Sequence, residues 1–181
     1  MKANFFIAFI LIQTISFSFQ SCPTIKTGKY FIFNKDNYVV FDIEKQSTKC
    51  GANLIIADKT GVLSQQFIIS QYYGEYYTIT NVKSKLALTA EFKKEGSKIE
   101  QTEIKGCPTI YQLWKFSEVC DDLYLIFNKA SGLAINGDSC ARNQCGDTLA
   151  ILVEKPCTPD IDNLLFKIFE VCPEVGCAAA Y

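Results

Sequence analysis

The chain has 181 residues, of which 49% are hydrophobic and 20% are charged, with only 10 glycines and 5 prolines. This composition excludes a disordered or collagen-like protein and indicates one compact domain. The 18 basic and 19 acidic side chains leave a formal net charge of -1, so the chain offers no electrostatic attraction for nucleic acid. Histidine is absent from the sequence, which excludes every catalytic site or metal centre that needs an imidazole.

The amino-terminal segment predicts secretion. An apolar run over residues 5–12 follows Met1 and Lys2, and small or polar residues follow it up to Ser21. This order is typical of a signal peptide, and the run is shorter than the roughly 20 residues that span a bilayer. We therefore expect residues 1–21 to be removed and the mature protein to be extracellular or in the secretory lumen, without a membrane span. Residues 19–22 also weakly resemble a bacterial lipoprotein box, in which Cys22 would be acylated.

The next feature along the chain is an internal repeat. The pattern Tyr-x-Ile-x-Asn occurs at residues 30–34, 77–81 and 124–128, so its asparagines lie 47 residues apart in both intervals. Three copies at one period indicate a repeat architecture. We expect a single domain over 22–181. Its repeats are predicted at about 28–73, 74–120 and 121–172, followed by a tail at 173–181.

Within each repeat the pattern predicts strands. Short segments rich in Ile, Val, Tyr and Phe alternate with Gly, Asn, Asp and Ser turns, and no stretch keeps a helical period. Each repeat has an aromatic residue near its end, namely Phe67, Trp114 and Phe166. We predict an all-β, closed pseudo-threefold barrel, because a solenoid needs capping units and more copies, and a sandwich gives no reason for a constant period.

All nine cysteines lie beyond the predicted cleavage site, where an oxidising compartment favours disulfides. Nine is an odd number, so at least one thiol has no partner within the chain. Closely spaced Cys-x-x-Cys pairs do not occur and no histidine is present, so we expect neither a metal site nor a cofactor.

The repeated residues together resemble the ricin-type lectin family. The shared features are the Tyr-x-Ile-x-Asn strand, the segment Ser131-Gly132-Leu133-Ala134-Ile135-Asn136 and the Gln112-Leu113-Trp114 motif. The resemblance covers about residues 28–170 and implies a β-trefoil. It also implies that the three terminal aromatic residues of the repeats pack around the pseudo-threefold axis rather than bind a ligand.

The resemblance implies three kinds of sugar-binding position in each repeat. They are an acidic residue after the Ser-Gly turn, an aromatic ring for stacking, and an Asn directly before the Gln-x-Trp motif. In repeat order, the acidic position holds Asp42, Thr89 and Asn136, the stacking position holds Ala57, Thr102 and Leu152, and the position before the motif holds Ser64, Tyr111 and Asn163. A carboxylate and an amide can fix vicinal hydroxyls, whereas a ring covers the apolar face of a pyranose.

This pattern predicts a carbohydrate-binding protein without catalysis, which binds a glycan, galactose being one option, through repeat 1 or repeat 3. The candidate ligand-binding residues are Asp42, Asn136, Asn163 and Tyr38. Since no stacking position holds a ring, a displaced tyrosine would have to replace it, and Tyr38, Tyr72, Tyr73 and Tyr111 are the candidates. The alternative is a secreted interaction trefoil that has lost sugar binding and binds a protein partner. An enzyme is not expected, because the paired carboxylates lie in turns where solvated charges are ordinary.

The cysteines occupy equivalent places in the repeat frame. Each repeat has a glycine at an equivalent place, namely Gly51, Gly96 and Gly146. Cys107 and Cys157 lie eleven residues after Gly96 and Gly146, and Cys120 and Cys172 lie six residues after Trp114 and Phe166. From this equivalence we predict Cys107–Cys120 and Cys157–Cys172, with Cys140–Cys145 as a local pair. Trefoil termini usually meet, so Cys22–Cys177 is the fourth predicted bond. Cys50 then remains for a bond between chains.

Overall fold

The computed structural model describes residues 25–35, 39–120, 122–137, 148–153 and 161–171. Of the predicted site residues, Tyr38 lies outside these described residues. So do six of the cysteines, which are Cys22, Cys140, Cys145, Cys157, Cys172 and Cys177.

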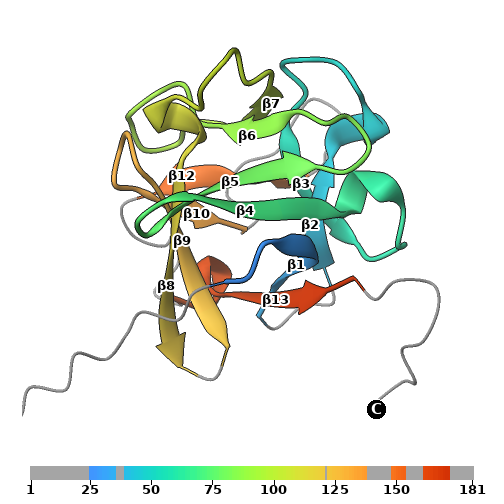
Figure 1. The fold of residues 1–181 in the computed structure, drawn as a ribbon. Helices are drawn as coiled ribbons and strands as arrows, with labels where there is room; N and C mark the ends of the chain where they lie inside the picture. Colours follow the sequence, from blue (N-terminus) through green and yellow to red (C-terminus); the bar gives the residue numbers. More distant parts are fainter. Residues whose placement is uncertain (1–24, 36–38, 121, 138–147, 154–160, 172–181) are drawn as a thin grey trace, which may run out of the picture.

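Six strands form a closed barrel (Figure 1). They are β1 (Gly28–Asn34), β4 (Phe67–Tyr73), β5 (Tyr76–Asn81), β8 (Trp114–Cys120), β9 (Leu123–Asn128) and β13 (Phe166–Glu170). Antiparallel pairing runs from β1 through β4, β5, β8, β9 and β13 and returns from β13 to β1. A ring of pairs leaves no free edge, so the barrel is closed.

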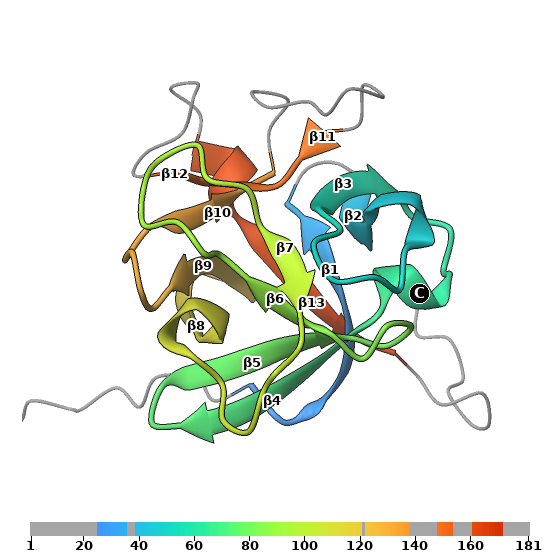
Figure 2. The ribbon, with the colours of Figure 1, turned by 90° about the horizontal axis from the view of Figure 1, so that it is seen from above.

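The remaining strands form one two-stranded unit in each repeat. They are β2 (Val39–Ile43) with β3 (Leu54–Asp58), β6 (Ala87–Thr89) with β7 (Glu100–Thr102), and β10 (Ala134–Asn136) with β12 (Ile151–Val153), while the short β11 (Thr148–Leu149) pairs with β3. These units adjoin one another, as Figure 2 shows, and the bridges Asn53–Glu100 and Lys98–Ile151 link them. The predicted all-β β-trefoil is confirmed.

A single-turn 3-10 helix precedes the last strand of each repeat. These helices are η2 (Leu63–Gln65), η3 (Ile110–Gln112) and η4 (Ile161–Leu164), and a further one, η1 (Glu44–Gln46), follows β2. In repeats 1 and 2 the backbone conformation explains why a glycine recurs in the turn. Gly51 and Gly96 have φ values of +81° and +77°, which side chains with a Cβ rarely adopt.

The core lies where the three repeats meet. Alternation along the strands turns Ile32, Ile79 and Ile126, one from each repeat, fully inward. Phe67, Trp114 and Phe166 are also fully buried, which confirms their predicted role as core residues. The indole of Trp114 donates a 3.0 Å hydrogen bond to the carbonyl of Leu88, so its one polar group is satisfied inside the core.

The asparagine of the repeated pattern supports the turn that follows its strand. The amide nitrogen of Asn81 donates to the carbonyls of Ser64 and Gln66 at 2.8 and 3.3 Å, and its oxygen accepts from the backbone of Lys83 and Ser84. Asn128 repeats this arrangement in the next copy, with a 2.9 Å bond to the carbonyl of Tyr111. The recurrence of Asn thus reflects a buried hydrogen-bond network.

The predicted Cys107–Cys120 disulfide is not formed, because both thiols are free and exposed, as is that of Cys50. Cys107 lies beside Tyr72 at the end of β4, and a hydrogen bond with its thiol raises the pKa of the Tyr72 hydroxyl. Cys120 instead ends β8, opposite Leu123 in the β8–β9 hairpin. Cys107 therefore lies in the loop between β7 and η3, beside Tyr72, whereas Cys120 belongs to the β8–β9 hairpin. Equivalence in the repeat did not predict whether the two thiols come close.

Candidate functional site

The acidic position of repeat 1 holds a buried carboxylate. Asp42 lies on β2, paired with Ile55 of β3, and is only 8% exposed. Its Oδ2 accepts a 3.1 Å hydrogen bond from Nε2 of Gln65, whereas its Oδ1 accepts none. A buried carboxylate oxygen without a donor is costly, and a ligand hydroxyl could satisfy it.

Gln65 holds this carboxylate in a fixed position. Its Nε2 also donates to the carbonyl of Asp58 at 2.8 Å, and its Oε1 accepts from the backbone N–H groups of Thr60 and Gly61 at 2.8 and 2.9 Å. One buried amide therefore connects β2 to the loop that follows β3. This satisfied network positions Asp42 without using its second oxygen.

Repeat 2 has the same framework with a different acceptor. Gln112 donates to the carbonyl of Glu103 at 3.1 Å, as Gln65 does to Asp58, and also to the hydroxyl of Thr102. Thr89 stands where repeat 1 has Asp42, and its hydroxyl lies 2.6 Å from that of Thr102. The two hydroxyls satisfy each other, so this position presents no charged group to a ligand.

The two predicted residues of repeat 3 differ in their exposure. Asn136, on β10, is fully buried. Asn163 is half-buried, and its carbonyl accepts hydrogen bonds from the backbone N–H of Gly137 at 3.0 Å and from the amide of Asn34 at 3.5 Å. The register also shows that Val153, rather than Leu152, is the counterpart of Ala57 and Thr102, because it pairs with Ala134. The assignment of these asparagines to a ligand stays a prediction.

Three of the four candidate tyrosines, Tyr72, Tyr73 and Tyr111, lie among the described residues. Tyr72 and Tyr73 are 45% and 46% exposed, but they lie five and six residues along β4 from Phe67, at about 3.3 Å per residue. The ammonium of Lys129 lies 4.2 Å from the centre of the Tyr73 ring and covers Tyr76 as well. Tyr111 is half-buried, with Lys93 at 5.7 Å from its ring centre.

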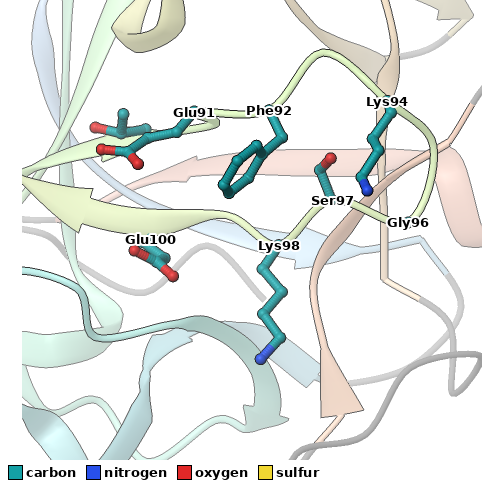
Figure 3. Close-up of a pocket in the computed structure, with 8 residues that line it drawn as sticks. Glu91, Phe92, Lys94, Gly96, Ser97, Lys98 and Glu100 are labelled. Atoms are coloured by element: carbon teal, nitrogen blue, oxygen red, sulfur yellow. The ribbon is translucent and has the colours of Figure 1, made fainter.

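A pocket of about 210 Å³ lies in repeat 2, on the segment that connects β6 to β7 (Figure 3). Phe92, whose side chain is 63% exposed, and Ser97, which is 5% exposed, both line it. The Ser97 hydroxyl has no hydrogen-bond partner. Sequence reasoning missed both residues, although a phenylalanine among the charged residues 91–95 is the kind of signal that could have identified the pocket.

Neither a membrane-spanning helix nor a metal-binding cluster occurs in the part of the chain that the structure describes. No helix there is long and apolar enough to cross a bilayer. No group of three or more acidic or cysteine side chains there could hold a metal ion.

The repeat geometry agrees with comparisons to known proteins. Residues 16–102 match a family model described as ricin-type beta-trefoil lectin domain-like. The chain resembles the ricin-type lectins. A comparison with curated proteins finds no match.

Three solved structures illustrate the likeness. The designed threefold-symmetric protein ThreeFoil is 22% identical, with a TM-score of 0.70 over 80% of this chain and 99% of its own. The Rhizoctonia solani agglutinin is 17% identical, with a TM-score of 0.65 over 82% and 99%. An exo-beta-1,3-galactanase from Clostridium thermocellum is 27% identical, with a TM-score of 0.69 over 81% of this chain, which spans only 31% of the galactanase.

The solved structures show the β-trefoil fold, and the family model shows a resemblance to ricin-type lectins, which suggests carbohydrate binding. Which repeat binds, and what it binds, depends on the side chains of this chain, because one fold hosts many functions.

Proposed function

We propose that this protein is a secreted, non-catalytic carbohydrate-binding protein and that Asp42 in repeat 1 is the centre of its sugar site. The observation that carries this proposal is the state of the Asp42 carboxylate. One oxygen is held by Gln65, and the other has no hydrogen-bond donor although the residue is only 8% exposed. A sugar hydroxyl would supply that donor in a charge-assisted hydrogen bond.

The differences between the repeats support repeat 1 as the working copy. Thr89 in repeat 2 is neutral and already paired with Thr102, and Asn136 in repeat 3 is fully enclosed. Ser64, at the position before the motif in repeat 1, is also fully buried, so it does not reach a ligand from the surface. Asp42 is therefore the predicted residue with both a charge and an unused acceptor.

The family likeness favours binding without catalysis. An agglutinin is among the similar folds, and the galactanase is similar to this chain over only 31% of its own length. A β-trefoil of this size corresponds to a part of that enzyme, so its activity does not pass to this chain. Secretion rests on the signal-peptide pattern of residues 1–21. Mass spectrometry of the secreted product would test that cleavage.

The test is a glycan array probed with the mature protein from about residue 21, oxidised as secreted, beside the variant Asp42→Asn. Asn is close to Asp in size but lacks its charge, so the loss of a charge-assisted bond of about 1.5–3 kcal/mol should weaken binding roughly 10- to 100-fold. Glu118→Gln, which removes an exposed carboxylate from β8, is the matched control. Asn136→Ala tests repeat 3 in the same experiment.

Equal binding by Asp42→Asn and the unchanged protein would refute the assignment of the site to repeat 1. A blank array from folded protein would instead support the second candidate, an interaction trefoil with a protein partner. The exposed pair Tyr72 and Tyr73 favours that candidate, because exposed aromatic side chains are common at protein interfaces.

A further inference from the structure

The pocket of repeat 2 contains a buried hydroxyl that the fold does not use. Ser97 is 5% exposed, and its Oγ has no hydrogen-bond partner, although its backbone N–H donates to the carbonyl of Lys94 at 3.2 Å. Nearly all buried hydroxyls in folded proteins are hydrogen-bonded. An unsatisfied hydroxyl on a pocket wall is therefore a candidate ligand contact.

An aromatic ring lies on the same pocket. Phe92 is the most exposed of the large hydrophobic residues that the structure describes, at 63%, and Figure 3 shows its ring in the pocket between Glu91 and Ser97. Exposing a phenylalanine costs the free energy that its burial would provide. The apolar face of a pyranose could cover this ring. Phe92 would then supply the stacking surface that Thr102, at the stacking position of repeat 2, does not provide.

The charges around the ring are separated. In Figure 3 the ammonium of Lys94 lies on the same side of Phe92 as Ser97, whereas the carboxylates of Glu91 and Glu100 lie on the other side. The side chain of Lys98, which also lines the pocket, extends away from the ring. A ligand with an anionic group at the first side and hydroxyls at the second would match both. Ser97 and Lys94 are hydrogen-bond donors, and the glutamates are acceptors.

We propose that this pocket binds a pyranose that carries a carboxylate, with its ring on Phe92 and its carboxylate between Ser97 and Lys94. The inference rests on the proposed function, since it assumes that the protein binds sugars. This pocket uses residues of the segment between β6 and β7 and not the position that Asp42 occupies in repeat 1. In repeat 2 that position holds Thr89, whose hydroxyl is paired with that of Thr102.

The test is calorimetric titration with three simple probes. Methyl β-glucuronoside and the methyl glycoside of N-acetylneuraminic acid carry a carboxylate on different ring carbons, and methyl β-glucoside is the neutral match of the first. We expect at least one acidic probe to bind about tenfold more tightly than the neutral one, as expected for an ionic hydrogen bond. The acidic probe that binds shows which placement of the carboxylate fits the pocket.

Three variants locate the site. Phe92→Ala should weaken the acidic probe by about tenfold, Ser97→Ala by about threefold, and Lys94→Gln should remove the preference for the carboxylate. Because the Ser97 hydroxyl has no partner, Ser97→Ala should not lower the melting temperature, which separates a ligand role from a structural one. Phe169→Ala and Lys26→Gln are matched controls, as both side chains are exposed and lie outside the pocket.

No binding of either acidic probe, equal binding of the neutral probe, or full binding by Phe92→Ala would each overturn the inference. The Asp42→Asn array distinguishes this failure from failure of the proposed function. If glycans bind through Asp42 while the acidic probes do not bind, only the inference about repeat 2 is wrong.

Discussion

The three equivalent asparagines allow a test of the trefoil framework within one chain. Asn81 and Asn128 occupy the same place in repeats 2 and 3, and both are buried with several hydrogen bonds from each end of the amide. Asn34, their counterpart in repeat 1, is equally buried, but its amide makes one long bond of 3.5 Å and its oxygen has no partner. The same substitution should therefore have different effects.

The expected magnitude follows from the bonds that each substitution removes. Asn81→Ala removes four hydrogen bonds to backbone groups, at 2.8, 3.3, 3.0 and 3.2 Å, and leaves the carbonyl of Ser64 without that donor. At about 1 kcal/mol net for each good bond, and with partial rehydration of the turn, the free energy of unfolding should fall by about 3 kcal/mol. Asn34→Ala removes one weak bond and should cost about 1 kcal/mol or less.

Urea unfolding, followed by the fluorescence of Trp114, measures these values directly. Trp114 is the single tryptophan of the chain and is fully buried, so its emission reports on the shared core. The loss in Asn81→Ala corresponds to a melting temperature lower by about 6–12 °C, at about 2–4 °C for each kcal/mol in a domain of this size. Asn128→Ala should behave like Asn81→Ala. If Asn34→Ala were as destabilising as Asn81→Ala, hydrogen-bond number would not explain the recurrence of this residue.

Three further measurements test other parts of the structure. Burial and, secondly, the negative charge of Glu170 raise the pKa of Tyr30 above its usual value of 10.0. The neutral Tyr30 therefore stabilises the fold fully below about pH 10, and this stabilisation is lost as the pH rises further. Tyr30→Phe should reduce the fall of the melting temperature at alkaline pH. Gln65→Ala should abolish the proposed repeat 1 binding, whereas Gln112→Ala should leave it intact at a similar cost in stability, measured by the same array and by thermal melting. Cys107→Ser and Cys120→Ser should each keep the melting temperature within about 1 °C, because both thiols are free; a loss of about 2–4 kcal/mol would indicate a disulfide.

The barrel was predictable because its signal is repeated. One copy of Tyr-x-Ile-x-Asn says little, but three copies in phase predicted which residues are equivalent, and the inward Ile32, Ile79 and Ile126 confirm it. Equivalence in a repeat fixes position on the barrel and says nothing about which neighbours come close. This is why Trp114 was correctly predicted as a core residue, whereas the predicted bond between Cys107, in the loop before η3, and Cys120, at the end of β8, is not formed.

The site was predictable only in part, for a different physical reason. The position of Asp42 followed from the repeat, but the hydrogen bond that leaves one oxygen unused depends on the side-chain rotamer of Gln65, which no pattern specifies. The pocket of Phe92 and Ser97 depends on the path of an irregular loop, where sequence periodicity gives no information.

The glutamine of the repeat separates the framework of the site from its chemistry. In repeats 1 and 2 the amide nitrogen of Gln65 or Gln112 donates to the equivalent loop carbonyl, of Asp58 or Glu103. The second acceptor of this nitrogen is the carboxylate of Asp42 at the acidic position in repeat 1, and the hydroxyl of Thr102 at the stacking position in repeat 2. Because the loop is held by bonds that do not involve the ligand-facing residue, that residue can differ between copies at little cost to the fold. A repeat can therefore lose the acidic position and keep the barrel, and sugar binding by one copy is compatible with different pockets in the others.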